Sequence, residues 1–461
     1  MGKPYRNELN LLQHTLDWSQ SVGIDQLIAH IKKSQGRPLF SVGSGGSLAA
    51  AHFQALLHQQ SGAITRAVTP IELYGCMNTL CEAGVFFLSA GGSNPDVLSA
   101  YRQAALNEPR SLGGLCVSLD SPLKSLAEQF QFSKLIDFDL PAGKDGFLAT
   151  NSLLALMVLL ARAYGAGNFG PDSKGIPLDV SGRFDVEQRV RAMRPDDAWL
   201  ILYGGWCQPA ASDLESKMSE AALAHGHLSD YRNFAHGRHH WLAKRGSETS
   251  VVALSTPSER PLAERTLALL PHDIPVLRLE TEAEGPRGTI DLLASVLYFT
   301  RALGERRGID PGRPGVPEFG RRIYNLKYVP QPRKFGDLTS VEATAIWRKI
   351  RPRDINSLSG SEREDWGKAL RAFKKDLTSK RFAAVVFDYD GTLCYTPDRF
   401  RPLSEPIIEQ LKRMLEAGVI IGVATGRGKS ARKELLSLPD RFHDRVYIGL
   451  PQRRRNPGPN R

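Results

Sequence analysis

The stretch PLFSVGSGGSLAAAHFQAL, from Pro38 to Leu56, indicates a strand, a glycine-rich turn and a helix in immediate succession. The apolar run over residues 38–42 is typical of a buried strand, and the Ala- and Leu-rich sequence after the turn is typical of a helix. Such a turn exposes backbone N–H groups at the positive end of the helix, where a phosphate can bind. A plain tight turn is the alternative. The residues predicted to contact a phosphate here are Ser44, Gly45, Gly46 and Ser47.

A second stretch, VFFLSAGGSNPDVL from Val85 to Leu98, repeats the pattern of strand, turn and helix. Pro95 suits the first turn of a helix, and Asn94 can cap it. If both strands belong to one sheet, the two turns place two helix N-termini around one anion. The predicted phosphate contacts from the second turn are Ser89, Gly92 and Asn94.

At these turns the chain resembles the sugar isomerase (SIS) family of phosphosugar-binding domains. The first family loop, Gly-Ser-Gly-x-Ser, is matched by residues 43–47. The second, Ser-Gln-Ser-Gly-Glu/Asp-Thr, is matched only at Ser89 and Gly92. A later family segment, Gly-x-Ala-Ser-Thr-Lys, precedes a helix that closes over the sugar; Thr150 lies in this region, and the resemblance implies that it contacts the phosphate. The resemblance implies parallel αβα sandwich domains and a phosphosugar ligand, but the altered second loop makes it a better guide to the fold than to the ligand.

Composition excludes several classes of protein. The chain has 461 residues, enough for two or three domains, and a net charge of +11 without a basic stripe interleaved with aromatics, so nucleic-acid binding is not expected. The five cysteines form no CxxC pair and no secretion signal is present, which favours reduced thiols and a cytoplasmic location. The most apolar helix, over residues 153–161, is too short to span a bilayer, so no membrane association is expected.

Strands and helices alternate along most of the chain, which predicts the α/β class with parallel sheets. A segment rich in Gly, Pro and Asp, residues 165–182, indicates a crossing between domains. We expect domains at residues 1–190 and 191–330, a helical linker at 331–380, and a last domain at 381–461 with a disordered tail. The first two resemble, as a tandem of SIS domains, the isomerase half of glucosamine-6-phosphate synthases.

The second SIS-like domain contains a candidate catalytic pair. In the aminosugar-synthase isomerase domains, a helix carries a Glu base and a downstream His-Gly-Pro turn carries the ring-opening His. The matching residues here are Glu220 and His236, with Arg238 in place of the family's Pro. Arg321 stands about where the family has a Lys that reaches into the site, and it keeps the positive charge. The alternatives are an exposed structural role for Glu220 and a metal site among the neighbouring histidines.

The last domain opens with an apolar strand followed by Asp-Tyr-Asp-Gly-Thr at residues 388–392, which resembles motif I of the haloacid dehalogenase (HAD) superfamily. The resemblance implies that Asp388 attacks phosphorus and Asp390 protonates the leaving group, with Mg²⁺ held by Asp388 and the backbone carbonyl of Asp390. Thr425 follows a second apolar strand and matches motif II, where it would bind a phosphoryl oxygen. The family's later Lys and acidic pair are not found, so we expect a partial Rossmann-like HAD domain with an incomplete site.

The function expected from these resemblances is isomerisation of an aldose or ketose phosphate, or cleavage of an amine-linked sugar phosphate, by a homodimer or larger homo-oligomer. The SIS tandem needs no cofactor, whereas the HAD-like module would use Mg²⁺. One alternative is a non-catalytic phosphosugar sensor that regulates the HAD-like domain or a partner, which the altered second loop favours. The other is a Mg²⁺-dependent phosphatase as the main activity. Glu220 together with His236 favours the isomerase.

Overall fold

The computed structural model forms two compact units, Met1–Arg333 and Lys334–Arg461. The residues that the structure describes are 2–130, 132–167, 169, 180–194, 198–326, 328, 336–350, 353–394, 402–426 and 429–449. The tail predicted to be disordered, residues 451–461, lies outside the described residues.

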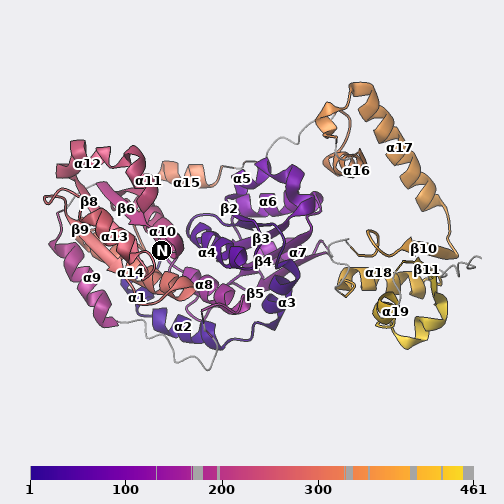
Figure 1. Ribbon diagram of the computed structural model, residues 1–461, viewed down its shortest axis with the longest axis horizontal. Helices are drawn as coiled ribbons and strands as arrows, with labels where there is room; N and C mark the ends of the chain where they lie inside the picture. Colours follow the sequence, from indigo (N-terminus) through magenta and orange to yellow (C-terminus); the bar gives the residue numbers. More distant parts are fainter. Residues whose placement is uncertain are drawn as a thin grey trace, which may run out of the picture. The chain divides into compact units, whose positions relative to one another are not determined.

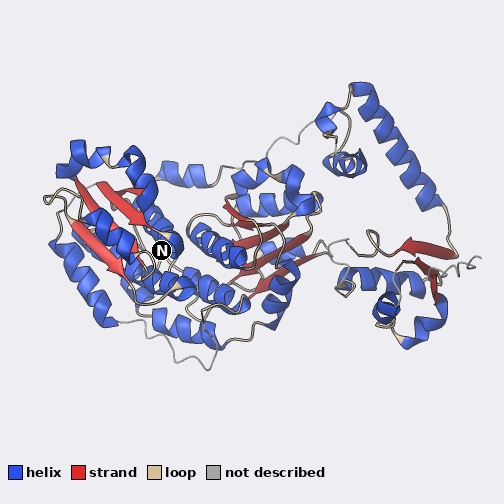
Figure 2. Cartoon of the chain, in the orientation of Figure 1, coloured by secondary structure: helices blue, strands red, loops and turns tan. Residues whose placement is uncertain are grey.

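The first half of the N-terminal unit is built on a five-stranded sheet with the order β2-β1-β3-β4-β5, in which all neighbours are parallel (Figure 1, Figure 2). Its strands are β1 Leu39–Val42, β2 Thr65–Val68, β3 Gly84–Ser89, β4 Ser111–Cys116 and β5 Ser133–Asp137. Its helices are α1 Tyr5–Leu9, α2 Leu12–Ser21, α3 Asp25–Ser34, α4 Gly46–Gln60, α5 Pro70–Gly75, α6 Pro95–Leu106, α7 Pro122–Ala127 and α8 Asn151–Ala163.

Helices cover both faces of this sheet, which explains why its strands read as continuous apolar runs. In β3, Phe86 and Leu88 face the core that includes α4 and α8. Val85 and Phe87 point the other way, into the core that includes α6. Every residue of β3 is therefore buried, as the sequence pattern predicted.

The second half is built on a four-stranded sheet with the order β7-β6-β8-β9, again parallel throughout. Its strands are β6 Ala198–Tyr203, β7 His225–Asp230, β8 Thr249–Ser255 and β9 Val276–Glu280. Its helices are α9 Val180–Ala192, α10 Gln208–Glu220, α11 Tyr231–Asn233, α12 His240–Arg245, α13 Arg260–Leu267, α14 Gly285–Arg307 and α15 Glu318–Tyr324.

The two sheets share one hydrophobic core. Helices α4 and α8 from the first half pack against α10 and α14 from the second half. The ring of Phe53 in α4 meets that of Trp206 in the turn after β6, with centroids 6.1 Å apart. The boundary predicted between residues 190 and 191 falls inside α9, which packs on α14 and β9 of the second half.

Helix α8 contains the apolar run predicted at residues 153–161 and begins at Asn151, because residues 145–150 form a polar turn before it. All but one of its residues are buried, and the remaining one, Arg162, donates to the carbonyls of Ser19 and Val22 at 2.6 and 2.8 Å. Among the described residues, no helix combines the length and apolarity needed to cross a membrane.

The C-terminal unit has a three-stranded parallel sheet with the order β10-β11-β12. Its elements are α16 Ser340–Ile350, α17 Gly360–Ser379, β10 Ala384–Asp388, α18 Glu405–Glu416, β11 Ile420–Ala424, α19 Lys429–Leu435 and β12 Val446–Gly449. One face of the sheet is packed, through Ile421 and Val423, whereas Val386 and Tyr447 on the other face are 72% and 60% exposed.

Candidate functional site

The order of the first sheet reverses direction between β1 and β3. The chain leaves β1 toward β2 and then returns to β3 on the other side. In open parallel sheets, ligands bind beyond the carboxyl ends of the strands at such a switch point. Because Val42 lies beside Phe87 in register, the turns after β1 and β3 flank this point, and these are the two turns that the sequence singled out.

The turn after β1 leaves the N-terminus of α4 open. Helix α4 begins at Gly46, and its N-cap is Gly45, with φ of 55° and no side-chain cap. Ser44 and Ser47 are half-buried, and within the described part of the chain neither hydroxyl has a hydrogen-bond partner. The N–H groups of Ser47 and Leu48 already donate to the carbonyls of Ser44 and Gly45 at 3.2 and 2.9 Å. Within the described residues, the N–H of Gly46 and the two hydroxyls can therefore receive an anion at this positive helix end.

The turn after β3 uses its polar side chains within the chain. The hydroxyl of Ser89 accepts from the N–H of Gly92 at 3.0 Å. The side-chain oxygen of Asn94 accepts from the N–H groups of Asp96 and Val97 at 2.9 and 3.1 Å and so caps α6. Gly92 has φ of 60°, which closes this tight turn. The side-chain oxygens of Ser89 and Asn94, both predicted to contact phosphate, thus act as acceptors within the turn, and only the O–H of Ser89 and the amide NH₂ of Asn94 could donate to a ligand.

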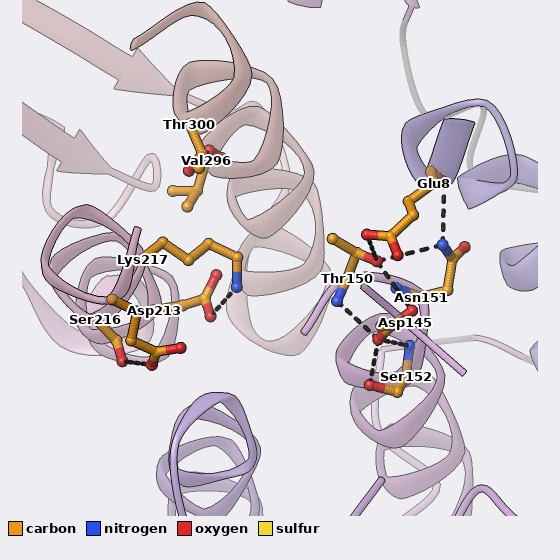
Figure 3. Close-up of polar contacts among 11 residues, drawn as sticks. Glu8, Asp145, Thr150, Asn151, Ser152, Asp213, Ser216, Lys217, Val296 and Thr300 are labelled. Atoms are coloured by element: carbon orange, nitrogen blue, oxygen red, sulfur yellow. Dashed lines mark hydrogen bonds and ion pairs between the residues drawn. The ribbon is translucent and has the colours of Figure 1, made fainter. Parts of the chain in front are cut away.

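The N-terminus of α8 is closed by a carboxylate of the chain (Figure 3). Asp145 accepts from the backbone N–H groups of Thr150, Asn151 and Ser152 at 2.9, 3.2 and 3.0 Å. Thr150 is fully buried, and its hydroxyl lies between Asp145 and Glu8. Its predicted role as a phosphate ligand is not supported by this placement, because its hydroxyl is already engaged.

The second sheet has a similar switch point, between β6 and β8, and a carboxylate of the chain itself lies there. Glu259 accepts from the backbone N–H of Thr256 at 3.3 Å and also from its hydroxyl. A Cβ at Gly205, in the turn after β6, would overlap the carboxylate of Glu259. An internal carboxylate therefore occupies the position at which an anion would bind. The N-terminus of α4 differs from the turns before α6 and α8 and from the switch point of the second sheet, because no described side chain caps it.

The candidate catalytic pair is exposed in the single chain. Glu220 is the last residue of α10, is exposed, and accepts a hydrogen bond from the hydroxyl of Ser216. His236 is exposed in the segment Phe234–Arg238, where Gly237 has φ of 98°. The burial expected for a Glu220 base is not found. Arg321 is also exposed, because α15 has no buried residue.

Two buried acidic groups were missed by the sequence analysis. Asp213 forms an ion pair with Lys217 at 2.6 Å, and their side chains are 0% and 2% exposed (Figure 3). Burial raises the pKa of Asp213 to about 6, although the charge of Lys217 opposes this. Burial also raises the pKa of Glu8 to about 7, and the nearby charge of Asp145 adds to the effect. The i,i+4 spacing of Asp213 and Lys217 was visible in the sequence, whereas the partners of Glu8 lie too far away along the chain.

The histidine-rich segment forms ring contacts. The ring of His227 lies 4.9 Å from that of His225 and 4.8 Å from that of Trp241, measured between centroids. No cluster of three or more His, Cys, Asp or Glu side chains suited to a metal occurs among the described residues. The alternative of a histidine metal site gains no support.

In the C-terminal unit, the residues of the two HAD-like motifs share one sheet edge. Asp388 ends β10, exposed, and lies in register with Ala424, the last residue of β11. Thr425 follows and donates its N–H to the carbonyl of Gly449 at 3.2 Å. Asp390 is half-buried, with Oδ1 3.9 Å from Cys394 Sγ. Two carboxylates supply only part of a Mg²⁺ ligand set, and within the described residues no third His, Cys, Asp or Glu side chain joins them.

Solved structures with the fold of this chain include three that are named for sugar phosphates. Glucosamine-6-phosphate deaminase from Thermotoga maritima is 18% identical, with a TM-score of 0.51 over 68% of this chain and 98% of its own. The C-terminal domain of glucosamine-fructose-6-phosphate aminotransferase from Francisella tularensis is 14% identical, with a TM-score of 0.52 over 66% and 96%. Tagatose-6-phosphate ketose/aldose isomerase from Escherichia coli is 16% identical, with a TM-score of 0.55 over 69% and 98%.

These likenesses are likenesses of fold, and they agree with the parallel-sheet α/β architecture expected from the SIS resemblance. No protein-family model matches the chain. No curated protein matches it either.

Proposed function

We propose that the chain binds a sugar phosphate at the turn Gly43–Ser47 and catalyses aldose–ketose isomerisation or the related release of an amine from an amino sugar phosphate. The observation that carries this proposal is the open N-terminus of α4 at the switch point of the first sheet. The neighbouring N-termini of α6 and α8 are closed by Asn94 and Asp145. A phosphate bound at the N-terminus of α4 would cap that helix as these side chains cap α6 and α8.

Two of the solved structures with this fold are, by name, a glucosamine-6-phosphate deaminase and a tagatose-6-phosphate ketose/aldose isomerase. Isomerisation moves a proton between adjacent carbons and requires a positioned base. Glu220 is the proposed base and His236 the proposed ring-opening residue, with Arg321 near the enediolate charge. Since all three are exposed in one chain, we propose that a second copy covers them in a homodimer or larger homo-oligomer.

The binding step is tested by a thermal-shift screen of sugar phosphates. A ligand at 100-fold above its dissociation constant should stabilise the protein by about 2.7 kcal/mol. The double variant Ser44→Ala/Ser47→Ala should weaken binding by about 2–4 kcal/mol, because both hydroxyls would donate charge-assisted bonds. Ser61→Ala, just beyond the other end of α4, is the matched control. Unchanged affinity in the double variant would place the phosphate elsewhere.

The catalytic step is tested by exchange of the sugar's C-2 proton with deuterated water. Glu220→Gln should slow exchange by about 10²–10⁴-fold while ligand binding is preserved. Glu215→Gln is a matched control on the same helix, because Glu215 accepts from Ser219 at 3.4 Å much as Glu220 accepts from Ser216. Equal loss in both variants would contradict the assigned role of Glu220.

A non-catalytic phosphosugar sensor is the second candidate. Two observations favour it: the side chain of Asn94 caps α6, and Glu220 is exposed. A wild-type protein that binds a sugar phosphate but shows neither C-2 exchange nor product would establish this candidate in place of the enzyme.

For the C-terminal unit we propose a partial HAD-like module with little or no Mg²⁺-dependent phosphatase activity of its own. The support is the placement of Asp388, Asp390 and Thr425 at one edge of a three-stranded sheet. A cytoplasmic location remains a proposal, based on the absence of a disulfide among the five cysteines, all of which the structure describes.

A further inference from the structure

The hydroxyl of Thr150 lies between two carboxyl groups that reach it from different parts of the chain (Figure 3). Thr150 Oγ1 is 3.0 Å from Glu8 Oε2 and 3.0 Å from Asp145 Oδ1. A threonine hydroxyl has one proton and donates one hydrogen bond. For both contacts to be hydrogen bonds, one of the carboxyl groups must carry a proton.

The surroundings assign that proton to Glu8. Asp145 accepts from three backbone N–H groups at the start of α8 and from the hydroxyl of Ser152, and these bonds stabilise its ionised form. Glu8 is 1% exposed, and its other oxygen accepts from the N–H of Gly146. A protonated Glu8 donates to Thr150, which in turn donates to Asp145. Every member of the buried network is then satisfied.

The residue before Thr150 connects this network to the proposed phosphate turn. Gly46 is the first residue of α4, and a Cβ on it would overlap the Cβ of Ala149. Helices α4 and α8 also pack against each other within the shared core. Because packed interiors transmit small shifts, a movement of residues 145–150 must reach Gly46.

We propose that Glu8 is a positioning residue for anion binding: protonated, it holds residues 145–150 against Gly46, and ionised, it loosens them and weakens binding at Gly43–Ser47. The inference rests on the proposed function for the place of the anion. On ionisation the carboxylates of Glu8 and Asp145 repel each other, and the single proton of Thr150 can serve only one of them.

Other ionisable groups surround Glu8 and must be separated from it. On the N-terminal side, the charge of Lys3 lowers the pKa of Glu8. Burial raises the pKa of Tyr5, and the charges of Asp213 of α10 and of Glu8 add to this effect. Asp310, after α14, accepts from the N–H of Tyr5 at 3.0 Å. Since the pKa of Asp213 is itself raised to about 6, the pH dependence of the wild type alone does not isolate Glu8.

The test measures sulfate binding by calorimetry at about pH 6 and about pH 8.5, with wild type, Glu8→Gln and Glu128→Gln. Sulfate keeps the same charge over this range, so changes report on the protein. Glu8→Gln imitates the protonated acid, since its amide donates to Thr150 and its oxygen accepts from Gly146. Glu128 is exposed at the C-cap of α7 and serves as the control. We expect the wild type and Glu128→Gln to bind about tenfold more weakly at the higher pH, and Glu8→Gln to bind equally at both.

Two outcomes overturn the inference. If Glu8→Gln keeps the pH dependence of the wild type, Glu8 is not the coupled group, although the binding site stands. If the wild type binds neither sulfate nor a sugar phosphate at any pH, the proposed function fails together with the inference. Hydrogen exchange of the amides of residues 46–48 in the wild type, corrected for intrinsic rates, provides a readout without a variant: faster exchange is expected at the higher pH, and equal exchange contradicts the coupling.

Discussion

Gly46 lies so close to Ala149 that no side chain fits between them. Gly46 begins α4, whereas Ala149 stands in the turn two residues before α8. These helices follow β1 and β5, between which β3 and β4 lie in the first sheet. Their contact brings the open turn of α4 and the closed turn of α8 together at one place. It also explains why the glycine-rich turn continues into the first residue of the helix.

Replacement of Gly46 by alanine should therefore damage the proposed site. The added methyl group must displace Ala149, at a cost of about 1–3 kcal/mol in stability for overpacking. We expect sugar-phosphate affinity to fall as well, because the N–H groups of the turn move. Gly23→Ala is the control, since nothing lies within 4 Å of a Cβ at Gly23. Wild-type affinity in Gly46→Ala, measured by calorimetry, would exclude this turn from the binding site.

Asn94→Ala should lower stability rather than affinity. The side-chain oxygen of Asn94 caps α6, and loss of such a cap costs about 1 kcal/mol. Thermal unfolding and sugar-phosphate titration of the same variant separate the two effects. Asn94→Asp should restore stability, because aspartate is an equally good cap. A variant that keeps its stability but loses affinity would return Asn94 to the role of phosphate ligand.

Local pattern was enough to predict the layered fold and the two turns at the switch point. The continuous apolar runs in β1 and β3 have the length of strands that are buried on both faces, and the structure places them as central strands of the sheet. The sequence could not show which turn remains open. That outcome depends on contacts across the chain, such as Glu8 with Thr150, 142 residues apart, and Gly46 with Ala149. The exposure of Glu220 was likewise invisible, because a helical pattern does not reveal where the helix ends.

Lys217→Met should strongly destabilise the N-terminal unit. The variant leaves Asp213 buried without its partner, which typically costs about 3–5 kcal/mol. The double variant Lys217→Met/Asp213→Leu should recover most of this loss, because it removes both buried charges. Chemical denaturation of the wild type and of the two variants measures both effects. If Lys217 instead serves a substrate, Lys217→Met would keep its stability and lose only ligand binding or turnover.

Glu8 should make stability fall as pH rises. Its pKa is raised from 4.5 to about 7 in the folded protein, so between these values the folded state binds more protons than the unfolded state. The contribution of Glu8 to the free energy of unfolding is fully present below pH 4.5 and is lost as the pH rises to about 7. Glu8→Gln should therefore gain stability relative to wild type across this window, by about 1–3 kcal/mol, and the difference should stay constant above it. A difference that does not change with pH, measured by thermal unfolding, would show that Glu8 is ionised throughout.

The C-terminal unit should hydrolyse a small phosphate ester, such as p-nitrophenyl phosphate, slowly or not at all in the presence of Mg²⁺. Asp388 and Thr425 share a sheet edge, but a HAD-type site also requires a cation for the phosphoryl group and further acids for the metal. The described residues hold no cluster of three or more His, Cys, Asp or Glu side chains suited to a metal ion. Mg²⁺ normally takes one or two carboxylates plus water and substrate phosphate, so weak binding of the ion alone would not imply turnover.

The variant Asp388→Asn tests the proposed nucleophile. The control is Asp444→Asn, because Asp444 is exposed and lies before β12. Rapid turnover that is abolished by Asp388→Asn and retained in Asp444→Asn would show that the missing groups are supplied, and the module would then be a phosphatase.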